Sequence, residues 1–234
     1  MSLTILLALA LAPGACIIFY IYVKDRYEKE PIRLLAMAFG LGIVSTFITL
    51  IISLPLDAWI PIEEHDLRAE AVHAFLLVAL VEEFSKFIFL RWVFFRNPNF
   101  NEPFDGIVYS IMIGMGFATF ENILYVMDGG FETAILRMFT AVPAHATFAV
   151  LMGYFVGRQK FEPDKPYLSF LGLIAAVLFH GAYDYCWFVS YVPGIWLGAI
   201  VSLVIGVALS RKAISVQQEA SPFRNPDPPS NAAT

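Results

Sequence analysis

Residues 71–95, AVHAFLLVALVEEFSKFIFLRWVFF, decide the fold, because they carry Glu82, Glu83 and Lys86 in the middle of a stretch long enough to cross a membrane. A spanning helix needs about 20 mostly apolar residues. An isolated strand cannot satisfy its backbone hydrogen bonds in lipid, so helix is the expected state. We therefore predict a membrane helix over residues 69–95 that buries ionisable side chains.

The rest of the chain has the same apolar character. Of 234 residues, 59% are hydrophobic and 15% are charged, whereas soluble domains average about 45–50% apolar and about 25% charged residues. The mean hydropathy is +0.69. The expected fold is an all-α, polytopic transmembrane bundle with about seven spans. The predicted spans are residues 3–23, 33–54, 69–95, 104–127, 137–156, 167–189 and 194–210.

The loop charges predict how this bundle lies in the bilayer. Loops one, three and five and the C-terminal segment hold 4, 2, 3 and 3 Lys and Arg residues, whereas the opposite loops hold Arg68 and Arg137. Basic loops stay in the cytoplasm, so the N-terminus is expected outside and the C-terminus inside. Residues 1–212 are predicted to form one membrane domain, and the polar, proline-rich residues 213–234 a disordered cytoplasmic tail. The sequence has no basic patch with interleaved aromatic residues, so nucleic-acid binding is not expected.

Glu82, Glu83 and Lys86 cost free energy inside a bilayer and are therefore expected to be paired and inward-facing. Glu82 and Lys86 are four residues apart and share a helix face. We expect Lys86 to hold Glu82 charged, leaving Glu83 freer to carry a proton. A purely structural Glu–Lys pair would explain one carboxylate but not the second.

Span four adds a second polar group. Glu121 and Asn122 lie about two turns from its outer end, and Phe117 is one turn before Glu121 on the same face. The alternative for Glu121 is an interfacial residue that reaches outer water. At a rise of 1.5 Å per residue, Glu121 is expected roughly 10 Å below the outer helix end.

Spans five and six contribute imidazoles. His145 follows Arg137 by eight residues, and His180 and Asp184 are four apart on one helix face. Asp184 is expected to orient His180. Either histidine is alternatively a helix-packing residue. The estimated depths allow the polar groups of spans three to six to meet in one cavity in the outer half of the bilayer.

Carboxylates, imidazoles and an amide predict chemistry on a water molecule. Glu83 or Glu82 is a candidate base for a water held by His145 and His180, and Asn122 or an imidazole is a candidate donor to the oxyanion. No cofactor is required for this scheme. The alternative is zinc held by His145, His180 and a carboxylate, although the sequence has no HExxH motif.

These residues resemble the motifs of the PrsW family of intramembrane proteases, distant relatives of the CAAX prenyl endopeptidases. The matching segments are 82–86 (EEFSK), 117–122 (FATFEN), 137–145, 180–184 (HGAYD) and the loop 25–31 (DRYEKEP). The resemblance implies a membrane-embedded endopeptidase of the bacterial inner membrane. It also implies a single-pass substrate, such as an anti-sigma factor, cut on its extracytoplasmic side.

Two other functions use similar residues. A proton-coupled transporter also buries Glu, Lys and His, but transporters often contain inverted repeats, and no internal repeat is evident here. A non-catalytic membrane scaffold would bind a partner without turnover. The oligomeric state is left open by the sequence.

Overall fold

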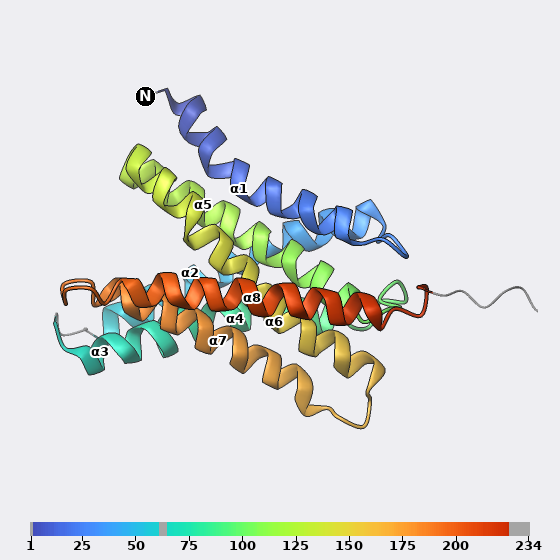
Figure 1. Cartoon of the computed structure of the whole chain (residues 1–234). Coiled ribbons are helices and arrows are strands. Elements are labelled where there is room, and N and C mark those ends of the chain that lie inside the picture. Colours follow the sequence, from blue (N-terminus) through green and yellow to red (C-terminus); the bar gives the residue numbers. More distant parts are fainter. Residues whose placement is uncertain (1, 61–64, 225–234) are drawn as a thin grey trace, which may run out of the picture.

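The computed structural model describes residues 2–60 and 65–224, and every regular element in these ranges is a helix (Figure 1). The all-α fold class is therefore confirmed. The elements are α1 (Leu3–Lys24), α2 (Ile32–Trp59), α3 (Leu67–Val72), η1 (His73–Ala79), α4 (Leu80–Phe89), η2 (Leu90–Phe94), α5 (Asp105–Phe139), α6 (Ala141–Phe161), α7 (Tyr167–Phe188) and α8 (Leu197–Glu219).

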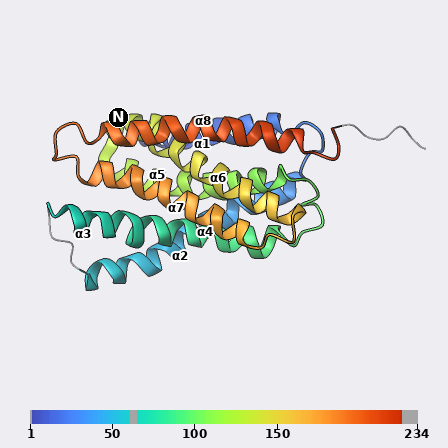
Figure 2. The same ribbon diagram turned by 60° about the horizontal axis from the view of Figure 1, so that its bottom comes forward.

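The helices run alongside one another between two ends of a bundle (Figures 1 and 2). The N-terminus, the α5–α6 corner and the α7–α8 connection lie at one end, which we call the amino end. The α1–α2 loop, the start of α5 and the end of α8 lie at the other, the carboxyl end. In the first half of helix α5, every residue from Asp105 to Thr119 is buried.

Apolar side chains cover the outside of this bundle. Phe19, Ile51 and Phe170 are 69%, 73% and 63% exposed. A soluble protein rarely exposes such side chains as a large contiguous surface. Among the described residues, five helical segments are long and apolar enough to cross a membrane, one of them running from Asp105 to Phe161. The protein is therefore membrane-embedded, whereas the count of about seven spans and the orientation of the termini stay predictions.

Prolines precede the first residues of α2 and α7, and an aspartate caps the start of α3. Pro31 and Pro166 directly precede α2 and α7, where the missing N–H of proline has no intrahelical partner to lose. The carboxylate of Asp66 accepts the Arg68 N–H at 2.8 Å and caps α3. The first N–H groups of a helix have no partner within the helix. The aspartate supplies an acceptor for one of them, whereas proline has no N–H to satisfy.

The predicted helix over residues 69–95 is present as α3, η1, α4 and η2 without a break in the helical assignment. Two π-helical segments flank α4, with the Leu80 N–H bonded to Phe75 O and the Phe95 N–H to Leu90 O. Each widened turn rotates the following face, and such bulges are frequent at functional sites. Helix α4, which carries Glu82, Glu83 and Lys86, thus lies between two shifts of helix register.

The predicted end of span four at residue 127 is close to a kink in α5, which leaves helical geometry at Gly130, where φ is 71°. The predicted start of span five at residue 137 is wrong, because a second helical segment of α5 follows this kink and ends at Phe139. Arg137 consequently lies on α5 rather than at the start of the helix that carries His145. Pro143 favours the break, because the first turn of a helix accommodates proline without loss of a hydrogen bond, and α6 begins at Ala141.

The predicted start of a disordered tail at residue 213 is also wrong. Helix α8 continues to Glu219 because its last turns pack on the bundle: Ala213, Ile214 and Gln217 are buried. The Gln217 side chain donates to Tyr154 O at 2.8 Å. Residues 225–234 of the predicted tail lie outside the described residues.

Two glycines allow α2 and α5 to touch. A methyl group added at Gly116 would overlap the carbonyl oxygen of Phe39, and one added at Gly42 would overlap that of Ile113. Small residues permit this backbone approach between membrane helices. Gly42 and Gly116 are therefore packing residues.

We expect Gly116→Ala to destabilise the bundle by about 1–3 kcal/mol, the usual cost of overpacking. Gly40→Ala is the matched control, because an added methyl at Gly40 meets nothing within 4 Å. Unfolding by SDS in mixed micelles measures both variants. Equal stability of the two variants would show that α2 and α5 do not approach as closely as described.

Candidate active site

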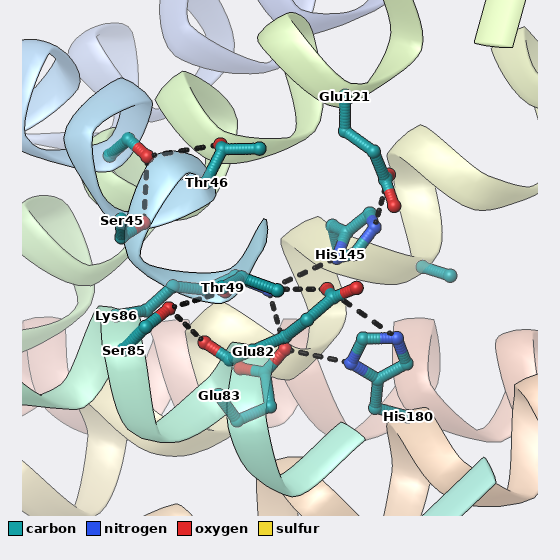
Figure 3. A network of polar contacts seen from close by, with 12 residues as sticks. Ser45, Thr46, Thr49, Glu82, Glu83, Ser85, Lys86, Glu121, His145 and His180 are labelled. Atoms are coloured by element: carbon teal, nitrogen blue, oxygen red, sulfur yellow. Dashed lines mark hydrogen bonds and ion pairs between the residues drawn. The ribbon is translucent and has the colours of Figure 1, made fainter. Parts of the chain in front are cut away.

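Four helices bring the sequence-predicted polar residues together around one cavity of about 490 Å³. Helix α4 supplies Glu82, α5 supplies Glu121, α6 supplies His145 and α7 supplies His180, and all four side chains line the cavity (Figure 3). Further residues that line the cavity lie toward the amino end of the bundle, namely Asp57, His73, Thr133, Arg137, Thr140, Asp184, Trp187 and Phe188. The expected meeting of these helices in one cavity is confirmed.

Lys86 bridges the two adjacent glutamates from behind the cavity wall. Its ammonium lies 2.7 Å from Glu83 Oε1 and 3.4 Å from Glu82 Oε2. The expected closer pairing of Lys86 with Glu82 is therefore wrong. Residues three and four apart are both neighbours on a helix, so spacing alone does not choose between them. Glu82 is the carboxylate of the pair that lines the cavity, whereas Glu83 is 1% exposed.

His180 is held between carboxylates on both sides of its ring. Its Nδ1 lies 2.9 Å from Glu83 Oε1, and its Nε2 lies 3.0 Å from Asp184 Oδ2 and 3.9 Å from Glu82 Oε2. The predicted contact between His180 and Asp184 is confirmed. Ionised carboxylates only accept hydrogen bonds, so the imidazolium form, with both nitrogens donating, satisfies this arrangement.

His145 links Lys86 to Glu121. Its Nδ1 lies 3.4 Å from Lys86 Nζ, and its Nε2 lies 3.1 Å from Glu121 Oε2. Because an ammonium only donates, Nδ1 accepts, and Nε2 carries the hydrogen that Glu121 accepts. The contacts therefore favour a neutral imidazole at His145 and an ionised carboxylate at Glu121.

Arg137 and Asn122 anchor Glu121 rather than facing a substrate. The Arg137 guanidinium donates to Glu121 Oε2 at 2.5 Å and to Asn122 Oδ1 at 2.9 Å. The Asn122 amide donates to Ala10 O at 2.9 Å, and its side chain is fully buried. The structure thus makes Asn122 a link from Arg137 to α1, away from the cavity, and gives no geometric support to its predicted oxyanion role.

Aromatic rings form the floor beneath the charged groups. The Lys86 ammonium lies 3.9 Å from the centroid of the Phe117 ring, a cation–π distance. Phe117 also packs at 5.7 Å on the His145 ring, and Phe148 stacks on His180 with ring centroids 4.8 Å apart. These rings exclude water from behind the cluster, which strengthens its electrostatic interactions. This packing gives Phe117 a structural role beside the charged groups.

Sequence reasoning missed two residues on the cavity wall, His73 and Asp57. The His73 Nε2 lies 3.6 Å from Asp57 Oδ1, and the imidazole stacks on Phe188 at 5.1 Å. His73 begins η1 in the same helical stretch as Glu82, so its place in that apolar run was the available signal. Asp57 carried no such signal, because it lies near the end of α2, next to a loop.

Four residues of this site have side-chain atoms that could bind a metal ion. Glu82, Glu83, His145 and His180 each place one ligand atom within 4.8 Å of the others, and carboxylates with imidazoles are ligands that Zn²⁺ accepts. The residues therefore fit a metal by type and spacing. The Lys86 ammonium already contacts three of them, and both His180 nitrogens face carboxylates.

Comparison with known proteins places the chain in a family. Residues 30–210 match the family described as PrsW family intramembrane metalloprotease. The chain is 35% identical over 228 residues to the protease PrsW of Geobacillus kaustophilus (strain HTA426), covering 97% of this chain and 99% of that protein. It is 34% identical over 182 residues to the protease PrsW of Bacillus subtilis (strain 168), covering 77% of this chain and 81% of that protein.

A third relative agrees. The protease PrsW of Clostridioides difficile (strain 630) is 32% identical over 213 residues, covering 87% of this chain and 86% of that protein. No solved structure matches the chain. The resemblance inferred from the motifs around Glu82, Glu121, His145 and His180 is confirmed over most of the chain. A family match that covers residues 30–210, with relatives above 30% identity, leads to one conclusion: this chain belongs to the PrsW family of intramembrane proteases.

Proposed function

We propose that the chain hydrolyses a peptide bond of a single-pass membrane protein, with the Glu82 carboxylate activating the attacking water. The observation that carries this proposal is the difference between the two glutamates. Glu83 accepts close contacts from Lys86 at 2.7 Å and His180 at 2.9 Å. Glu82 faces the cavity, and its contacts to the same two residues are 3.4 and 3.9 Å.

In the proposed reaction, Glu82 first accepts a proton and later donates it. Glu82 takes a proton from water while the hydroxide forms a bond to the carbonyl carbon of the scissile peptide. The same proton then passes to the leaving nitrogen as the carbon–nitrogen bond breaks, which returns Glu82 to its ionised form. The His180 Nε2–H donates to Asp184 Oδ2 at 3.0 Å, so His180 could donate to the oxyanion only after this contact opens.

The other cluster residues would position these groups. Lys86 compensates the charge of both glutamates, and Asp184 holds the His180 ring. Arg137 holds Glu121, which in turn orients His145. Fixed partners of this kind keep reacting groups within small tolerances of a productive geometry.

The place of the cavity supports the proposed substrate class. A cavity of about 490 Å³ lies within the roughly 300–1,000 Å³ typical of ligand pockets, which suits a short unwound stretch of chain. Its lining residues lie toward the amino end of the bundle. The loops of the carboxyl end carry most of the Lys and Arg residues, which supports a cytoplasmic C-terminus and hence cleavage near the extracytoplasmic face.

A zinc-dependent version of the same hydrolysis is the second candidate. Two observations favour it: the four donor atoms within 4.8 Å and the family description as a metalloprotease. Glu82, Glu83, His145 and His180 would hold the ion, which would supply a Lewis acid and a more acidic water. Lys86 would have to leave its contacts with these residues first.

Metal removal separates the two versions. The purified chain, reconstituted in liposomes with a tagged single-pass substrate, is expected to keep its cleavage rate after treatment with a chelator and dialysis. Metal analysis of the active preparation should show less than one zinc per chain. If the chelator abolishes cleavage and added zinc restores it, the glutamate version is wrong and the zinc version stands.

A further inference from the structure

A second group of carboxylates lies at the carboxyl end of the bundle, where α1 leads into α2 and α5 begins (Figures 1 and 2). Glu28 and Glu30 come from the α1–α2 loop, and Asp105 is the first residue of α5. Each places one oxygen atom within 4.8 Å of the other two. Asp25 and Glu102 add two further negative charges beside them.

Four of these five carboxylates are buried and Glu28 is half-buried, yet several of their oxygen atoms lack partners. Asp25 and Asp105 are 0% exposed and Glu30 is 2% exposed. Asp105 Oδ2 accepts the N–H groups of Asn101 at 2.7 Å and Glu102 at 2.8 Å. Within residues 2–60 and 65–224, however, Asp25 Oδ1, Glu30 Oε1 and Asp105 Oδ1 have no hydrogen-bond partner. Unpaired buried acceptors of this kind are costly.

The rest of the group shows the same deficit. Glu28 Oε2 and Asn101 Oδ1 are also unpartnered among the described residues. Tyr109 donates a hydrogen bond to Glu30 Oε2, and Ser221 donates one to Glu102 Oε2. A single phenol and a single hydroxyl satisfy two oxygen atoms of this cluster and leave its negative charge unchanged.

The nearby lysines do not neutralise the cluster. The Lys29 ammonium donates to the carbonyl oxygens of Tyr22 at 2.7 Å and Asp25 at 3.0 Å. Lys160 donates to Phe95 O. In the part of the chain that the structure describes, neither lysine forms an ion pair with these carboxylates. Buried ionised carboxylates without partners cost several kcal/mol each, so protons or a bound cation must offset this charge.

We propose that Glu28, Glu30 and Asp105 bind a hard divalent cation, Ca²⁺ or Mg²⁺, with Asp25 and Asn101 supplying further oxygen atoms. The donor set is all oxygen, which both ions prefer. Two ligands of one ion lie at most twice the metal–oxygen distance apart, about 4.6–5.2 Å for Ca²⁺ and about 4.0–4.2 Å for Mg²⁺. The observed limit of 4.8 Å admits Ca²⁺ without movement of the ligands.

The proposed cation site is separate from the active site. Asp105 and Glu121 are 16 residues apart on α5, about 24 Å at 1.5 Å per residue. The cation would join the α1–α2 loop to the first turn of α5. Its expected effect is therefore on the stability of the fold rather than on the cleavage reaction.

The test uses the full chain in detergent, treated with EDTA, desalted and held at about pH 8, where model carboxyl groups are ionised. CaCl₂ and MgCl₂ are added in separate titrations, followed by tryptophan fluorescence during heating and by calorimetric binding. At 100 times the Kd, the ratio of folded to unfolded chain is expected to rise about 100-fold, seen as a higher Tm.

Three variants make the result specific. Asp105→Asn is expected to lose the cation response, and its stability without cation should equal or exceed that of the native chain because one buried charge is removed. Asp164→Asn, an exposed matched control, should retain the response. Glu82→Gln should also retain it, which separates this site from metal binding at the active site. No Tm change with either cation up to about 10 mM, above the Kd of weak natural Ca²⁺ sites, or an unchanged response in Asp105→Asn, would overturn the proposal.

Discussion

Glu82→Gln is expected to lower kcat for substrate cleavage by about 10²–10⁴-fold, the usual contribution of a general base. The amide keeps the shape of the side chain but cannot take a proton from water. Because Glu82 lines the cavity while its contacts to Lys86 and His180 are long, the fold should tolerate the change. The measurement is a time course of cleavage of a tagged single-pass substrate in liposomes.

Two comparisons make this prediction specific. Glu132→Gln is the matched control, because Glu132 is exposed on α5, and it should cleave at the native rate. Glu83→Gln keeps the cavity-facing carboxylate and should retain more activity than Glu82→Gln. If Glu83→Gln loses all activity in a folded protein while Glu82→Gln retains it, the base is Glu83, and the role assigned from the cavity is wrong.

Lys86→Met is expected to destabilise the bundle by about 3–5 kcal/mol, the cost of leaving a buried charge without its partner. The Lys86 side chain is 5% exposed, and those of Glu82 and Glu83 are 8% and 1% exposed. Water therefore cannot replace the ammonium at Glu83. The measurement is the free energy of unfolding from SDS titrations in mixed micelles.

A second substitution separates charge compensation from a loss of packing. Adding Glu83→Gln to Lys86→Met removes the stranded carboxylate, so the double variant should recover roughly 0.5–3 kcal/mol relative to Lys86→Met, a normal coupling energy for residues in contact. Lys212→Met, at an exposed position of α8, is the control and should leave stability unchanged. A double variant less stable than Lys86→Met would show that charge compensation is not the role of Lys86.

Contacts within one helix could be predicted in kind from the sequence, because helix spacing is regular. The contact of His180 with Asp184 follows from a separation of four residues, and the structure contains it at 3.0 Å. Spacing was less decisive where two candidates were both neighbours. Lys86 is three residues from Glu83 and four from Glu82, and the His180 contact to Glu83 from another helix accompanies the closer pairing observed.

The sequence could not predict which side chains contact each other between helices. Arg137 was expected to begin the helix of His145, but it lies on α5 and reaches back 16 residues to Glu121. That contact depends on the irregular geometry at Gly130 and on the break before α6. Asn122 was expected to face a substrate, whereas its amide binds Ala10 O on α1. Neither partner is near in sequence, so no periodicity points to it.

The stretch around Glu82, Glu83 and Lys86 by itself determined that this is a helical membrane protein with buried ionisable groups. The physical reason is that lipid requires long apolar helices and makes each charge within them costly enough to need a partner. Only the tertiary structure decided which partner each charge has. Lys86 and His180 hold Glu83 more closely than Glu82, because side chains from α4 and α7 meet there at distances that depend on how the helices pack.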